Sequence, residues 1–126
     1  MNNPERSACF RLEDGEEKMT YTGDTKINNA GTFILNKEDH TIGNLLRMQL
    51  LRDPAVRFAG YQTPHPLIHK VVLKVQTVSS NVAPVDVVSA AVEDLANETD
   101  HLTIQMREAM DTWKKQNNTS GFMGNF

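Results

Sequence analysis

The sequence is short of features that mark several classes of protein. It holds one cysteine, Cys9, so it can form no internal disulfide and cannot build a thiolate metal cage. No apolar run approaches the roughly 20 residues of a membrane-spanning helix. The N-terminus lacks the basic and then apolar regions of a signal peptide. We therefore expect a soluble intracellular protein with no membrane partner and no redox or zinc-finger chemistry.

Positive charge is also scarce. Thirteen Lys and Arg residues stand against sixteen Asp and Glu, which gives a formal net charge of −3. Because no overall positive field favours a polyanion, we expect no direct sequence-specific contact with nucleic acid. Neither a G-x-x-x-x-G-K-[ST] phosphate loop nor a G-x-G-x-x-G turn occurs, so we expect no nucleotide and no other cofactor.

What is present is an ordinary globular composition. The chain has 126 residues, of which 39% are hydrophobic and 23% charged, and this fits one domain with its own core. There is no repeat at a fixed period. We expect a single domain over residues 1–115, followed by a loosely ordered tail over residues 116–126 that mixes Asn, Gly and Ser without periodicity.

Short strands should dominate the first part of the chain. Five segments have the β-branched, aromatic or alternating apolar pattern of strands. They are residues 8–12, 18–22, 30–35, 56–61 and 67–77. The first two flank Asp14-Gly15, a turn-forming step that predicts a hairpin.

A helix interrupts the strands within residues 36–54. Asp39 and Thr41 can cap its first turn, and Asp53-Pro54 stops it because the residue before a proline avoids the α conformation. Its apolar residues extend beyond the roughly 100° arc of one buried face. The pattern leaves open whether the surplus fills this chain's core or contacts a partner.

A second, long helix is predicted over residues 84–115, which contain no glycine and no internal proline. Its apolar residues recur in steps of four and three, interrupted only at Thr99, as in a coiled-coil seam. They are Val88, Val92, Leu95, Leu102, Met106, Ala109 and Trp113. At 1.5 Å per residue the helix is about 45 Å long, longer than the ~30 Å breadth of a small domain. We therefore favour an intermolecular partner for residues 102–113. The order β-β-β-α-β-β-α predicts an α+β fold with two helices covering a sheet.

Candidate catalytic and metal residues have simpler interpretations. His65 and His69 have a zinc-binding spacing only if both lie on a helix, which Pro64 and Pro66 disfavour. Asp39-His40 suits a helix cap better than a general base, because no nucleophile motif accompanies it. We expect no metal site.

A set of basic and aromatic residues could form a nucleic-acid patch, although a solvated face is the favoured interpretation. The set is Arg47, Arg52, Arg57, Lys70 and Lys74 with Phe58 and Tyr61.

The run HTIGNLL at residues 40–46 resembles the dimerisation motif of RNA polymerase α-like subunits, a family that extends from the bacterial α N-terminal domain to archaeal subunit L. The segments KEDHT at 37–41 and FAGYQTPHPL at 58–67 resemble the small α-like subunit of eukaryotic polymerase II. The related small subunit shared by polymerases I and III usually lacks the second segment. The resemblance extends nearly to Lys115.

This resemblance implies an antiparallel sheet with two helices and a subunit without catalytic residues of its own. It implies an obligate heterodimer with the larger α-like third subunit, which serves as a platform for the second-largest and largest catalytic subunits in the nucleus. The implied dimer contacts are Ile42, Leu45, Leu46, Gln49, Leu50, Val88, Val92, Leu95, Leu102, Met106 and Trp113. Arg47 matches a basic position that can face a large subunit, and Gly43 is expected to permit close approach of helices.

Three alternatives stay open. One is the small subunit of polymerases I and III. Another is a free-standing homodimeric domain that binds nucleic acid through Arg47, Arg57 and Lys70. The third, an enzyme built around Asp39, His40 and His65, has the weakest support.

Overall fold

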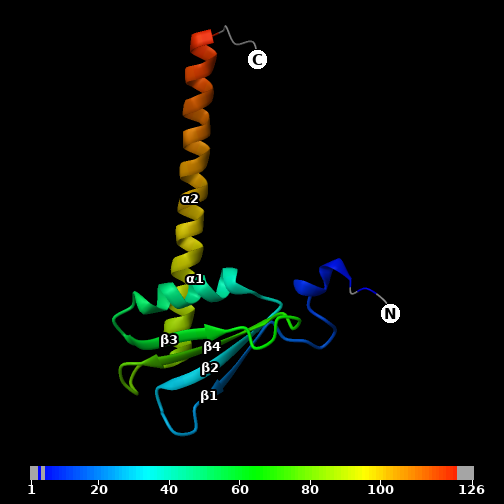
Figure 1. The fold of residues 1–126 in the computed structure, drawn as a ribbon. Helices are drawn as coiled ribbons and strands as arrows, with labels where there is room; N and C mark the ends of the chain where they lie inside the picture. The colour runs from blue at the N-terminus through cyan, green and yellow to red at the C-terminus, as the bar shows by residue number, and fades with distance from the viewer. Residues whose placement is uncertain (1–2, 4, 122–126) are drawn as a thin grey trace. The chain divides into compact units, whose positions relative to one another are not determined.

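The computed structural model describes residues 3 and 5–121. These residues form a short 3-10 helix, four strands and two α-helices (Figure 1). The elements are η1 (Arg6–Cys9), β1 (Met19–Gly23), β2 (Ala30–Asn36), α1 (His40–Leu51), β3 (Val56–Gln62), β4 (Lys70–Thr77) and α2 (Pro84–Gly121). Contacts divide the chain into two compact units, Met1–Val92 and Glu93–Phe126.

The first unit is built on one antiparallel sheet with strand order β1-β2-β4-β3. The predicted α+β fold with an antiparallel sheet is therefore confirmed. Register places Phe33 beside Leu73, and Leu35 beside Val71, on one face. Both pairs are buried, and α1 packs across this face over β3 and β4.

The strict alternation of β4 separates the two faces of the sheet. Val71, Leu73, Val75 and Thr77 are buried, whereas the residues between them are partly or fully exposed. The sheet therefore has one buried and one solvated face. The first turns of α2 belong to the same unit and bury Val87, Val88 and Ala91.

The prediction of a strand at residues 8–12 was wrong. The chain there forms η1 and a turn, in which the backbone N–H groups of Phe10 and Arg11 donate to the carbonyl of Ser7. The Asp14-Gly15 turn does form, with Gly15 at φ 79°. Phe10 and Leu12 are exposed and have no strand to pair with, so their alternation does not place them on a buried sheet face.

Two element boundaries also differ from the predicted ones. β4 begins at Lys70 rather than at residue 67, because the backbone N–H of Ile68 donates to the carbonyl of His65 in a turn. α2 continues past Lys115 to Gly121, the first glycine after its start. The predicted tail at 116–126 thus begins as helix, and its residues 122–126 lie outside the described residues. Within the described part of the chain, no helix combines the length and hydropathy that a membrane crossing needs.

Candidate protein–protein interface

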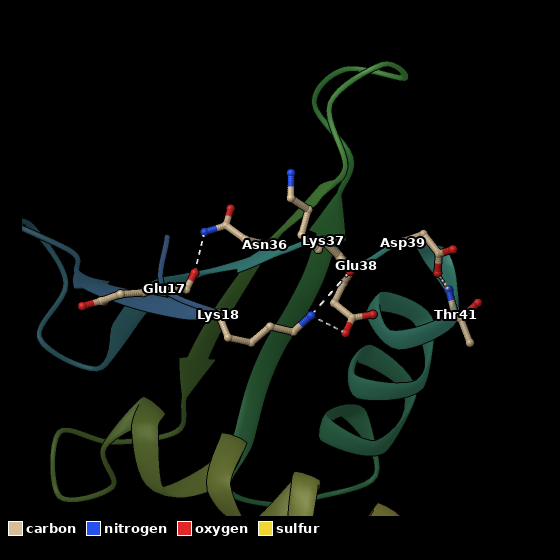
Figure 2. A network of polar contacts seen from close by, with 7 residues as sticks. All are labelled: Glu17, Lys18, Asn36, Lys37, Glu38, Asp39 and Thr41. Atoms are coloured by element: carbon tan, nitrogen blue, oxygen red, sulfur yellow. Dashed lines mark hydrogen bonds and ion pairs between the residues drawn. The ribbon is translucent and has the colours of Figure 1, made fainter. Parts of the chain in front are cut away.

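The start of α1 is fixed by a capping interaction. Asp39 lies in extended conformation, and its Oδ1 accepts a hydrogen bond from the backbone N–H of Thr41 at 2.9 Å (Figure 2). That hydrogen bond is the main reason why the pKa of Asp39 is lowered from its ordinary value. Capping, the favoured interpretation of Asp39-His40, is therefore confirmed, and it satisfies one of the free donors of the first helical turn.

A network of polar contacts holds the segment that leads into α1 (Figure 2). Lys18 forms an ion pair with Glu38 at 2.7 Å, and Asn36 Nδ2 donates to the carbonyl of Glu17 at 2.8 Å. Lys37 adopts a left-handed conformation with φ 61°, and its N–H donates to the carbonyl of His69. Contacts from two other segments, residues 17–18 and His69, thus hold the chain where it enters α1.

α1 has two apolar faces. The inner face, with Gly43, Leu46 and Leu50, is buried in the unit, and Leu46 is only 3% exposed. Leu45 and Met48 lie three residues apart on the outer side and are 47% and 56% exposed. Exposed large apolar side chains at this spacing form a surface suited to a protein partner.

A polar cluster flanks α1 next to β3. His40 Nδ1 lies 2.8 Å from the hydroxyl oxygen of Tyr61. The guanidinium of Arg47 lies 6.0 Å from the centre of the Tyr61 ring, and its Nη2 donates to Asn44 Oδ1. Among the described residues, Arg47 Nε is a buried nitrogen without a hydrogen-bond partner. His40 thus has a structural contact in this chain.

The second unit is helical over its described residues and carries the far part of the predicted seam. Leu102, Met106 and Trp113 are 60–66% exposed, and Leu95 is partly exposed. Thr99, which interrupts the seam, donates its hydroxyl to the carbonyl of Leu95 at 2.8 Å. The hydroxyl of Thr99 is therefore satisfied within the helix, and the seam needs no polar partner there.

The structure divides the predicted contact residues into three groups by exposure. Leu46, Leu50 and Val88 are buried in the first unit, so they serve the chain's own core and are not available at the surface. Ile42, Gln49 and Leu95 are partly exposed. The surface group comprises Leu45, Val92, Leu102, Met106 and Trp113.

Several exposed apolar residues of the two helices are missing from the predicted contact set, among them Met48, Leu51 and Met110. The signal was present in the sequence, because Met48 and Leu51 carry the apolar surface of α1 beyond one face.

The other candidate residues are not brought together. Lys70 belongs to the exposed face of the sheet, whereas α1 with Arg47 lies on the opposite face. Phe58 and Tyr61 are three residues apart on β3 and also face opposite sides. His65 Nδ1 accepts a hydrogen bond from the backbone N–H of Leu67 in the β3–β4 loop. No group of three metal-binding side chains occurs among residues that the structure describes.

An antiparallel sheet covered by a helix with a second, exposed apolar face, together with a long helix that carries an exposed seam, defines the class of helix-mediated dimerisation subunits. Residues 30–105 match the RNA polymerase Rpb3/Rpb11 dimerisation domain. The chain belongs to this family.

Curated relatives agree. The DNA-directed RNA polymerase II subunit rpb11 of Dictyostelium discoideum is 50% identical over 98 residues, which cover 78% of this chain and 81% of that protein. The RPB11 subunit of Schizosaccharomyces pombe is 44% identical over 109 residues, covering 86% and 87%. Both are named for polymerase II, which favours this branch over the subunit shared by polymerases I and III.

A solved structure shares the fold. Subunit L of the DNA-directed RNA polymerase from Thermoplasma acidophilum superposes with a TM-score of 0.63 at 22% identity. The match covers 79% of this chain and 96% of that one. The resemblance inferred from residues 40–46 is thus confirmed at the level of family and fold.

Proposed function

We propose that this chain is a non-catalytic assembly subunit of DNA-directed RNA polymerase II. It heterodimerises with the α-like third subunit, and the pair is the platform on which the second-largest and then the largest catalytic subunits assemble for mRNA transcription in the nucleus. The family match at residues 30–105 supports dimerisation, and the curated relatives support polymerase II. The exposed seam of α2 is the observation that carries the proposal.

The seam gives the dimer its driving force. Burying Leu102, Met106 and Trp113 is worth about 1.5–3 kcal/mol for each side chain. The flanking positions Glu98, Gln105 and Thr112 include one charge only, so association there depends on apolar packing rather than ion pairs. A chain that exposes this surface without its partner would aggregate, which makes the complex obligate.

The outer face of α1 supplies a second contact with the same partner. Leu45 and Met48 replace the buried Leu46 and Leu50 as the contact residues of this helix, with Ile42 and Gln49 at the edge. Arg47, which is partly exposed, is the proposed contact with a large subunit because it matches the basic position of the family motif.

Sedimentation of the chain co-expressed with the α-like third subunit tests the proposal. The variants Leu102→Asp and Leu45→Asp each place a carboxylate on a proposed contact surface. We expect the one-to-one complex to weaken by at least about 10- to 100-fold, since each loses an apolar contact of about 1.5–3 kcal/mol.

Two control positions carry exposed apolar side chains that lie outside the proposed contact surfaces. Ile104 is 52% exposed, but at 100° per residue it lies about 200° around α2 from Leu102. Leu67 is 81% exposed in the β3–β4 loop. Complexes with Ile104→Asp and Leu67→Asp should sediment as wild type. If the wild-type chain is a stable monomer that does not bind the third subunit, the proposal is wrong.

A further inference from the structure

Within the part of the chain that the structure describes, no helix covers the central strands on the sheet face opposite α1. We call it the open sheet face, and its central residues are Ile34, Val72, Lys74, Phe58 and Gly60. Every residue of the strands on this face is partly or fully exposed, in contrast to the buried residues on the other face. Its side chains therefore remain available to a partner when α1 and α2 are engaged.

A hollow of about 220 Å³ lies on the β3–β4 half of this face, lined by Phe58, Gly60, Tyr61, Gln62, Val72 and Lys74. Register places Gly60 beside Lys74 and Gln62 beside Val72. Gly60 has no side chain, so it leaves space at the bottom of the hollow. A Cβ at this position would lie 3.0 Å from Cζ of Phe58. The hollow thus has apolar walls and a polar rim, and its size suits one large side chain.

Charge on this face has one sign. Lys70 and Lys74 are its ionisable residues, and the chain as a whole carries a net charge of −3. Asp24 in the β1–β2 turn, which is near enough to Lys74 to feel its charge, accepts hydrogen bonds from the backbone N–H groups of Lys26 and Ile27. These bonds, followed by the charges of Lys26 and Lys74, lower the pKa of Asp24. A local positive field on an acidic protein favours an acidic ligand.

We propose that the open sheet face is a second protein-docking surface, which takes an acidic segment of a partner protein and holds one of its apolar side chains in the hollow over Gly60. The segment's carboxylates pair with Lys74 and Lys70 at the rim. Single-stranded nucleic acid fits less well, since its chain of phosphates would meet two lysines only. Phe58 is also placed as a wall of the hollow beside Gly60 and not as a free ring on which a base could stack.

Photo-crosslinking in the assembled polymerase tests this docking surface. A p-benzoyl-phenylalanine in place of Gln62, at the rim of the hollow, should form an adduct with a protein segment that contains more Asp and Glu than Lys and Arg. Lys74→Glu should reduce the yield by about tenfold or more, whereas Lys74→Arg keeps it. Gly60→Val, which fills the hollow, should reduce it likewise.

The docking surface rests on the proposed function in one respect, because the assembled polymerase is the sample that is purified. A second crosslinking position tests the two separately. The crosslinker in place of Met48 reports the dimer contact of α1. If Met48 yields the third subunit and Gln62 yields nothing, the docking surface is wrong and the dimer stands. A nuclease-sensitive adduct, a segment without acidic excess, or a yield indifferent to Lys74→Glu would also overturn the docking surface.

Discussion

The ring of Tyr61 on β3 occupies the space that a side chain at Gly43 on α1 would need. A Cβ at Gly43 would lie 2.7 Å from Cδ2 and 2.8 Å from Cε2 of Tyr61. The ring is also held by α1 itself, because its hydroxyl contacts Nδ1 of His40, three residues before Gly43, at 2.8 Å. The close approach expected of Gly43 thus occurs within the chain, between a helix and a strand, and it sets the distance of α1 from the sheet.

Gly43→Ala should therefore destabilise the fold, although alanine is the better helix former. The gain in helix propensity is at most about 1 kcal/mol. Overpacking against a ring that cannot turn away costs about 1–3 kcal/mol. We expect a lower free energy of unfolding in urea titrations followed by circular dichroism.

The double variant with Tyr61→Ala identifies the cause. Once the ring is gone, Gly43→Ala should stabilise the chain relative to Tyr61→Ala alone, by up to about 1 kcal/mol. An equal effect of Gly43→Ala in both backgrounds would show that the Tyr61 contact is not what requires glycine.

Periodicity predicted α1 and α2 well but could not choose between the two apolar faces of α1. Leu45 and Leu46 are equally apolar, and only the position of β3 decides which one is buried. That position depends on the Gly43–Tyr61 contact, which joins residues far apart in the sequence. The strand predicted at residues 8–12 was wrong for a related reason. An alternating pattern forms a strand only where a neighbouring strand is available to pair with it.

Adjacent leucines on α1 should respond differently to the same substitution. Leu46 is 3% exposed, so Leu46→Asp places a carboxylate in the core and should abolish cooperative unfolding. Leu45 is 47% exposed, so Leu45→Asp should keep the secondary structure and lose only the partner. Circular dichroism and sedimentation on the same samples separate the two effects. Equal loss of structure in both variants would contradict the assignment of faces.

Thr77 connects the end of β4 to the loop that leads into α2. Its side chain is fully buried, and Oγ1 lies 2.7 Å from the carbonyl oxygen of Val82 and 2.9 Å from that of Ser79. Thr77→Val keeps the shape and removes the donor, which should cost about 1–3 kcal/mol of unfolding free energy. Thr22→Val on the exposed strand β1 is the matched control and should stay within about 0.5 kcal/mol of wild type.

Acid should weaken the fold through the cap of α1. The pKa of Asp39 is lowered from 3.8 in the folded chain, chiefly by the hydrogen bond from the N–H of Thr41. A carboxylate with a lowered folded pKa stabilises the protein above its unfolded pKa, and this contribution is lost as the pH falls through the folded value. The thermal midpoint of wild type should therefore fall as the pH drops below 3.8.

Asparagine can also cap a helix but does not titrate, so Asp39→Asn should show a shallower fall over the same range. Asp24, whose pKa is lowered in the same way, should contribute independently, and Asp24→Asn combined with Asp39→Asn should flatten the profile further. Profiles of the single variant and wild type that run parallel would show that the cap does not depend on the charge of Asp39.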